Sequence, residues 1–237
     1  MIGILVGLAI SWILLFLIEK KHILALGFLP IPRRAKQFAF GFLITGTLCA
    51  LAQCFEAYLK GADWVFYEHI SGATVLEALF WDFKSVVTEE LIFRGALLYI
   101  LIQKLGSTKA IWISAIAFGI YHWFSFDILG NVLPMIFVFI ATGLMGFAWA
   151  YAFSKTRSIM LPIGLHLGWN AVHNTIFSKG PLGEIILKWT GGSELTDWSS
   201  LLNFTASSIV VPILLIIWIR YVVKEETEVV PAMELDG

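Results

Sequence analysis

The sequence predicts an all-α membrane protein, a multi-pass bundle of about seven transmembrane helices (six to eight). Of its 237 residues, 59% are hydrophobic and only 14% are charged, whereas soluble domains carry about 25% charged residues. The 10 Trp and 19 Phe supply the aromatic residues that gather at membrane interfaces. A soluble fold of this length cannot bury so much apolar surface. These observations exclude an ordinary soluble domain, a disordered chain and a disulfide scaffold.

Apolar stretches divide the chain into the predicted spans, since a helix needs about 20 apolar residues to cross the membrane. The third stretch would be about 42 Å long as one helix, and its first half is amphipathic, so we expect it to begin at the membrane surface or to line a wet cavity. The first stretch lacks a cleavage signal and is predicted to be an uncleaved span. The seven spans are Ile2–Ile18, Phe38–Leu59, Thr74–Ile102, Ala110–Trp123, Val132–Phe153, Ile159–Phe177 and Phe204–Val223.

The positions of Lys and Arg predict the orientation, because these residues prefer cytoplasmic loops. Lys60, Lys179 and Lys188 lie in the loops of the opposite set. The alternation predicts an N-terminus outside and a cytoplasmic C-terminus. The basic residues assigned to the cytoplasmic side are Lys20, Lys21, Arg33, Arg34, Lys36, Lys104, Lys109, Lys155, Arg157, Arg220 and Lys224.

The chain is organised around a central membrane core. Residues 1–70 are predicted to form an N-terminal pair of spans, and residues 71–178 the catalytic core. Residues 179–237 comprise an outer loop, the last span and an acidic cytoplasmic tail. The net charge of −1 gives no sign of a nucleic-acid partner, so the lipid bilayer is the expected surroundings. The simplest location is the plasma membrane of a prokaryote, as a multi-pass protein.

Six polar residues interrupt the apolar spans, and they are the candidate site. An ionisable residue inside a membrane is costly, so it indicates a function by default. The alternative is that these residues form buried ion pairs and hydrogen bonds that only hold helices together. The six are Glu89, Glu90 and Arg94 in EELIFR, His122 in FGIYH, and His166 and Asn170 in HLGWN.

The spacing within EELIFR separates the two carboxylates. Glu90 and Arg94 are four residues apart and share one helix face, so they are expected to pair. Glu89 is rotated from Glu90 by about 100°, which leaves it unpaired and the more basic of the two, as a general base requires.

The residues of the three motifs are expected to lie at similar depths in the membrane. At 1.5 Å per residue, Glu89 is about 20–24 Å from the cytoplasmic end of its span, His122 about 18–20 Å and His166 about 11–16 Å. His166 and Asn170 are four residues apart and project into the same space. The three helices are therefore expected to meet at one intramembrane site.

Several other residues are interpreted as packing. Gly164 and Gly168 form a GxxxG spacing that lets a neighbouring helix approach closely. His173 is expected to be a satisfied polar residue rather than a catalytic one. Asp82 and Lys84 are expected to pair with each other or to line an access path, and the first interpretation is favoured.

The three motifs, in this order and on separate hydrophobic helices, resemble the CPBP family of CAAX prenyl proteases and bacteriocin-processing or immunity proteins, also called Abi. The family pattern of EExxxR, FxxxH and HxxxN is matched by Glu89-Glu90 to Arg94, Phe118 to His122, and His166 to Asn170. The resemblance covers about residues 85–175. It implies an intramembrane endopeptidase acting on a membrane-associated protein or peptide. In eukaryotic members of the family, the substrate is a prenylated CAAX protein cleaved after its lipidated cysteine.

Two mechanisms are compatible with these residues. In the metal-free version, Glu89 and His122 activate a water while His166 and Asn170 donate to the oxyanion. In the other, Glu89, His122 and His166 hold a catalytic zinc, which needs three protein ligands and an open position. The sequence has no HExxH motif, and Asn170 suits an oxyanion hole better than a zinc shell. The metal-free version, with no cofactor, is therefore favoured.

Two functions other than proteolysis remain as alternatives. The protein could be a non-catalytic immunity protein that binds a bacteriocin or its receptor, with the same residues serving as structural contacts. A proton-coupled transporter is less favoured, because the chain lacks the paired, interrupted spans expected of inverted repeats.

Overall fold

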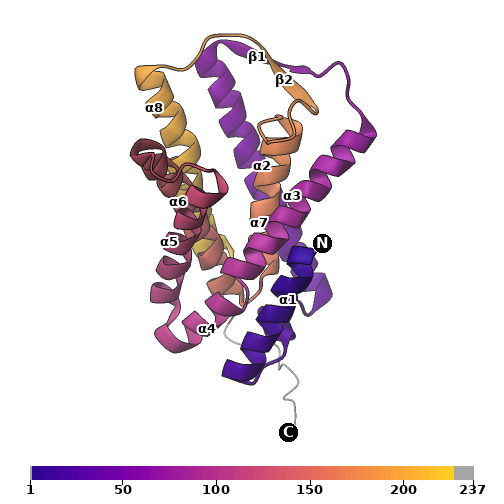
Figure 1. Ribbon diagram of the computed structural model, residues 1–237, viewed down its shortest axis with the longest axis vertical. Helices are drawn as coiled ribbons and strands as arrows, with labels where there is room; N and C mark the ends of the chain where they lie inside the picture. The colour runs from indigo at the N-terminus through magenta and orange to yellow at the C-terminus, as the bar shows by residue number, and fades with distance from the viewer. Residues whose placement is uncertain (1, 227–237) are drawn as a thin grey trace.

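The computed structural model describes residues 2–226 as an elongated bundle of helices with a short β-ribbon at one end (Figure 1). Some helices end in π-helical or 3₁₀ turns, labelled η. The helical elements are α1 (Ile2–Leu14), η1 (Leu15–Glu19), η2 (Ile23–Leu26), α2 (Ile31–Lys60), α3 (Gly72–Phe93), α4 (Ala96–Leu105), α5 (Ser107–Ser125), α6 (Val132–Thr156), α7 (Met160–Asn170), η3 (Ala171–Ile176), α8 (Asp197–Thr205), η4 (Ala206–Val210) and α9 (Val211–Val222).

Within residues 2–226, four helical segments are long and apolar enough to cross a membrane, namely Ile2–Glu19, Ile23–Lys60, Val132–Thr156 and Asp197–Val222. They coincide with the first, second, fifth and seventh predicted spans. The other three predicted stretches carry the candidate site residues, and their helices are shorter, broken or more polar. The helical membrane class is thus established, while the count of seven spans and the membrane orientation stay predictions.

The third predicted stretch is not one helix. It breaks at Arg94 and Gly95 into α3 and α4, and α4 follows the lower end of α3 in Figure 1. A Cβ atom on Gly95 would overlap the carbonyl oxygen of Leu91, so the break requires glycine. The break also releases Arg94 from the regular helix at the point where its side chain turns into the bundle.

A two-stranded antiparallel ribbon joins the two loops predicted to share the outer side. Strand β1 (Ala62–Phe66) pairs with β2 (Leu187–Gly191), and the Trp64 and Trp189 rings stack with centroids 3.9 Å apart. The sequence predicts no strands here, because each is only five residues long and the alternation of apolar and polar residues in β2 is too short to stand out.

Helix α7 packs closely against α2 through the GxxxG pair. A Cβ atom on Gly164 would overlap the carbonyl oxygen of Phe38, and one on Gly168 that of Phe42. The close approach expected from the GxxxG spacing is confirmed, with α2 as the partner helix. This contact fixes the helix that carries His166.

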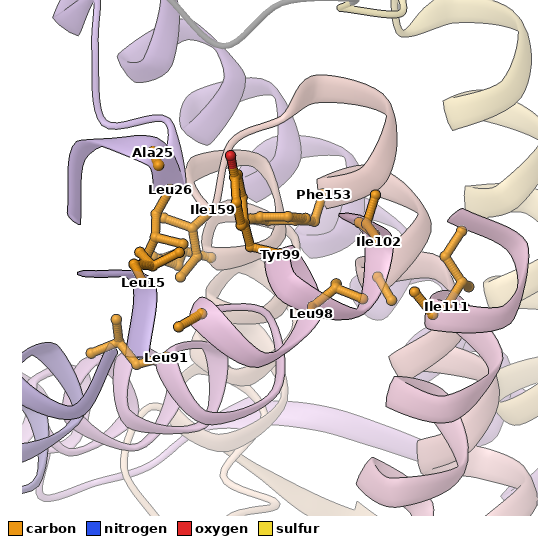
Figure 2. Packing of buried hydrophobic residues seen from close by; sticks show 14 of the residues in the cluster. Leu15, Ala25, Leu26, Leu91, Leu98, Tyr99, Ile102, Ile111, Phe153 and Ile159 are labelled. Atoms are coloured by element: carbon orange, nitrogen blue, oxygen red, sulfur yellow. The ribbon is translucent and has the colours of Figure 1, made fainter. Parts of the chain in front are cut away.

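The loops rich in Lys and Arg gather at the other end of the bundle. Arg34, which is buried, donates to the carbonyl oxygen of Thr156 over 3.3 Å and to Glu226 over 3.0 Å. Lys104 pairs with Glu19 over 3.1 Å. A hydrophobic cluster that includes Leu15, Leu26, Tyr99, Phe153 and Ile159 packs near this end (Figure 2). These contacts agree with one shared side for the basic loops; residues 227–237 of the predicted tail lie outside the described residues.

Candidate active site

Glu90 is the centre of a polar cluster that joins α3 to α7. Arg94 Nη1 lies 3.1 Å from Glu90 Oε1, and His166 Nδ1 lies 2.8 Å from the same oxygen. The spacing of four residues places Arg94 one turn after Glu90, and the predicted ion pair forms. Neither side chain of the pair has any exposed area. Glu90 therefore acts from inside the bundle and does not meet solvent.

Arg94 extends this cluster to α6. Its Nη2 donates to the carbonyl oxygen of Gly146 over 3.2 Å, and its guanidinium carbon lies 4.1 Å from the centroid of the Phe118 ring. A Cβ atom on Gly146 would come within 2.9 Å of Phe118 and 3.1 Å of Arg94. The small residue on α6 thus makes room for the buried guanidinium, which carries the positive charge that Glu90 needs.

Glu89 points away from this buried pair. Ser85 Oγ donates to Glu89 Oε1 over 3.2 Å, and Glu89 Oε2 lies 3.9 Å from His166 Nε2. The Glu89 side chain is 14% exposed, whereas that of Glu90 is fully enclosed. Two adjacent carboxylates therefore have different surroundings, as the helical rotation between them predicted.

The ring of His122 is held in one tautomer. Its Nδ1 lies 2.8 Å from the carbonyl oxygen of Phe118, which can only accept, so Nδ1 carries the hydrogen. In the neutral ring, Nε2 is then an acceptor. The Phe118 ring lies against the imidazole, with centroids 4.5 Å apart. His122 is thereby prepared to accept a hydrogen bond from water.

His166 lies between the two carboxylates. Its Nδ1 donates to Glu90, because Glu90 is the carboxylate paired with Arg94. Its ring stacks on Trp149 with centroids 3.9 Å apart and an interplanar angle of 19°. Carboxylate oxygens of Glu90 and Glu89 lie near its two ring nitrogens. When the ring is protonated on both nitrogens, Nε2 is also a donor.

The candidate residues of α3, α5 and α7 face one cavity of about 520 Å³. Glu89, His122, His166 and Asn170 line it, whereas Glu90 and Arg94 lie behind its wall. The Asn170 side chain makes no hydrogen bond within residues 2–226. The cavity has the size of a small-molecule or peptide subsite. The apolar part of its wall includes Phe118, Phe126, Ala141, Met145, Trp149 and Trp169.

A second buried carboxylate, Asp82, lies two turns before Glu89. It does not pair with Lys84 as favoured from the sequence. Asn174 Nδ2 donates to Asp82 over 2.7 Å, and Thr175 Oγ1 over 3.1 Å. The π-helical segment η3 carries both donors, and its side-chain directions could not be anticipated from an α-helical period.

Residues that the sequence analysis missed also line the cavity. Trp149 supports the His166 ring, Ser85 holds Glu89, and Lys179 and Pro181 belong to the loop after η3. Polar spacing identifies charged or imidazole groups inside spans, but gives no signal for a tryptophan among apolar residues. His173 lines the cavity too and donates from Nδ1 to Asn174 Oδ1 over 3.0 Å.

The alternative zinc site was tested against the same side chains. Across residues 2–226, no group of three or more His, Cys, Asp or Glu side chains is arranged to hold a metal ion. Glu89, His122 and His166 therefore do not form a metal-ligand set as they lie.

Comparison with known proteins gives one match. Residues 71–172 match the family model described as type II CAAX prenyl endopeptidase Rce1-like. No curated protein and no solved structure matches the chain significantly. The matched segment runs from the start of α3 into η3 and contains every candidate site residue. A match to this family over residues 71–172 implies an intramembrane protease. Residues 71–172 of this helical membrane protein thus form an Rce1-like CAAX prenyl endopeptidase domain.

Proposed function

We propose that the protein hydrolyses a peptide bond of a membrane-associated protein or peptide, with Glu89 as the general base. One observation carries the proposal: Glu89, His122, His166 and Asn170, from three helices, line the same cavity. A carboxylate, an acceptor imidazole and two candidate donors are the groups that water-mediated attack on an amide needs.

In the first step, a water binds between Glu89 and His122. The carboxylate takes one proton from the water, while His122 Nε2 accepts a hydrogen bond from the other. The water oxygen attacks the scissile carbonyl carbon, and the carbonyl π electrons move to the oxygen. His166 Nε2–H and the Asn170 side-chain amide donate to this oxyanion. Buried donors of this kind stabilise a developing charge strongly, because little water competes with them.

In the second step, the tetrahedral intermediate collapses. The carbonyl re-forms, the C–N bond breaks, and Glu89 returns its proton to the leaving nitrogen, which departs as an amine. Glu90 and Arg94 do not touch the substrate in this scheme. Glu90 holds His166 in orientation, and Arg94 pairs with Glu90. These are positioning roles.

The wall of the cavity supports a substrate with an apolar part. Aromatic and aliphatic side chains surround the polar groups, and burial of apolar area contributes about 25 cal/mol per Å². A lipid chain attached next to the cleaved bond would bury such area. A prenylated CAAX-type end is therefore the substrate that we propose, in agreement with the name of the matched family.

The test is cleavage of a farnesylated peptide that ends in Cys-Val-Ile-Met, incubated with the purified full-length protein in lipid vesicles. Mass spectrometry should detect cleavage after the farnesylated cysteine. The unlipidated peptide should be cleaved more slowly. His122→Ala should abolish cleavage, while His69→Ala, an exposed loop histidine, should not. A wild-type protein that cleaves neither peptide would overturn the proposal of a prenylated CAAX-type substrate.

Metal dependence is measured separately. With Glu89 as base and no metal in the steps above, the protein should retain its cleavage rate after treatment with a strong chelator. Loss of activity that zinc restores would contradict the proposed mechanism but not proteolysis itself.

A further inference from the structure

Glu89 borders a second hollow besides the main cavity. A lateral cleft of about 290 Å³ lies between α1, α3 and α5, where Gly3, Lys84, Thr88 and Tyr121 line it. Trp81, Ser85 and Glu89 line both this cleft and the main cavity. The proposed base therefore lies where the two hollows meet. A peptide bound across Glu89 would have one part in the lateral cleft and the other part in the main cavity.

Lys84 is the cation of this cleft. Within residues 2–226, its ammonium group makes neither an ion pair nor a side-chain hydrogen bond. Two lysines of the loops at the ribbon end are paired, Lys60 with Glu56 and Lys188 with Glu68. Lys84 is half-buried, and an anionic ligand in the cleft would form a charge-assisted hydrogen bond with it. The cleft places that partner beside the reacting bond.

The separation of Lys84 from Glu89 sets the length of the ligand. Five helical residues give a rise of about 7.5 Å, and the flexible lysine side chain adds about 6 Å of reach. The ammonium can therefore reach a point about 8–14 Å from Glu89 along the helix axis. An extended peptide advances about 3.4 Å per residue. Two to four residues span this distance, and three lie at the centre of the range.

From this geometry we infer that Lys84 binds the free C-terminal carboxylate of the substrate, about three residues beyond the scissile bond. The inference rests on the proposed function and names its specificity-determining residue. The segment released by cleavage lies in the lateral cleft, and the lipidated part lies in the larger apolar cavity. Lys84 thereby restricts cleavage to chain ends, because an internal bond offers no carboxylate at that distance.

The other walls of the cleft favour a peptide over a lipid headgroup. Ser85, Thr88 and Tyr121 carry hydroxyl groups, which can hydrogen-bond to the amides of a short extended peptide. An acyl chain has no polar atoms that could form hydrogen bonds with these hydroxyl groups. A phosphate group bound at Lys84 would give no role to Glu89, the proposed base, which lines both the cleft and the main cavity.

The experiment compares two farnesylated peptides ending in Cys-Val-Ile-Met, one with a free carboxylate and one with a C-terminal amide. The wild-type protein should cleave the acid about 10- to 100-fold more efficiently, the range expected for a charge-assisted contact. Lys84→Met should lose most of this preference through a higher KM for the acid, and Lys84→Arg should keep it. Lys109→Met, an exposed lysine at the start of α5, is the matched control and should behave as wild type.

Three outcomes would overturn the inference. If the wild-type protein cleaves the acid and the amide equally well, Lys84 does not bind the C-terminal carboxylate, although the protein is still a protease. An equal loss on both peptides in Lys84→Met indicates a structural role. A Lys84→Met defect that appears only in vesicles containing phosphatidylglycerol assigns the lysine to lipid. Cleavage of neither peptide by the wild-type protein would instead remove the proposed function, and this inference with it.

Discussion

Helix α3 carries two clusters of buried carboxylates, two turns apart, that are satisfied in different ways. Asp82 accepts from the neutral side chains of Asn174 and Thr175. Glu90 accepts from Arg94 and from His166. Both carboxylates are fully buried. Glu89 differs from both, because it borders two hollows. Full burial among donors is typical of a carboxylate that holds helices, although Glu90 Oε2 itself makes no hydrogen bond. Partial exposure beside donors is typical of a carboxylate available for chemistry.

The largest expected effect is on catalysis. Glu89→Gln keeps the shape of the side chain but removes the base, so kcat should fall by about 100- to 10,000-fold. The unfolding temperature in detergent should stay close to that of wild type, since Glu89 makes no buried ion pair with Arg94. Rates from peptide cleavage and thermal unfolding curves check the two parts. An active Glu89→Gln variant would remove the distinction between Glu89 and its neighbours.

Glu90→Gln should chiefly lower stability. It leaves the buried Arg94 without its carboxylate, a change that costs about 3–5 kcal/mol. Cleavage by the remaining folded protein should also fall, because His166 loses the acceptor for Nδ1–H. The free energy of unfolding, measured by denaturant titration in detergent, tests this effect. A Glu90→Gln variant as stable as Glu89→Gln would show that the pair contributes nothing to the bundle.

Asp82→Asn should have a smaller effect, because its partners carry no charge. The new amide group would face the donors of Asn174 and Thr175, which loses a hydrogen bond and costs about 1–3 kcal/mol. The variant should keep most of its cleavage rate when it is folded. A rate loss as large as that of Glu89→Gln, at normal stability, would place Asp82 in the chemistry and end the contrast.

Glu68 is an exposed carboxylate that can be compared with the buried Asp82 and Glu90. Lys188 hydrogen-bonds to it at 2.6 Å and 2.7 Å, which holds the pKa of Glu68 below its ordinary value. A lowered pKa in the folded state stabilises the protein above the ordinary pKa, and this contribution is lost as the pH falls through the lowered value. Glu68→Gln should therefore change the unfolding temperature least of the four variants, and only above that pH range.

Several properties followed from the sequence alone. The apolar composition determined the membrane class, because no soluble interior could hold so many apolar residues. The spacing of four residues determined the Glu90–Arg94 pair, and GxxxG determined a close helix contact at Gly164 and Gly168. These are local properties of a helix, whose fixed period relates neighbouring residues without knowledge of the rest of the chain.

Only the tertiary structure decided the rest. The break at Gly95, the stacking of Trp149 on His166, and the hydrogen bonds of Asp82 to η3 all depend on contacts between segments distant in sequence. The same holds for the cleft at Lys84, which needs α1 and α5 as its other walls. A helical period states which side chains share a face, but which helix covers that face, and where a hollow is left, is decided by packing.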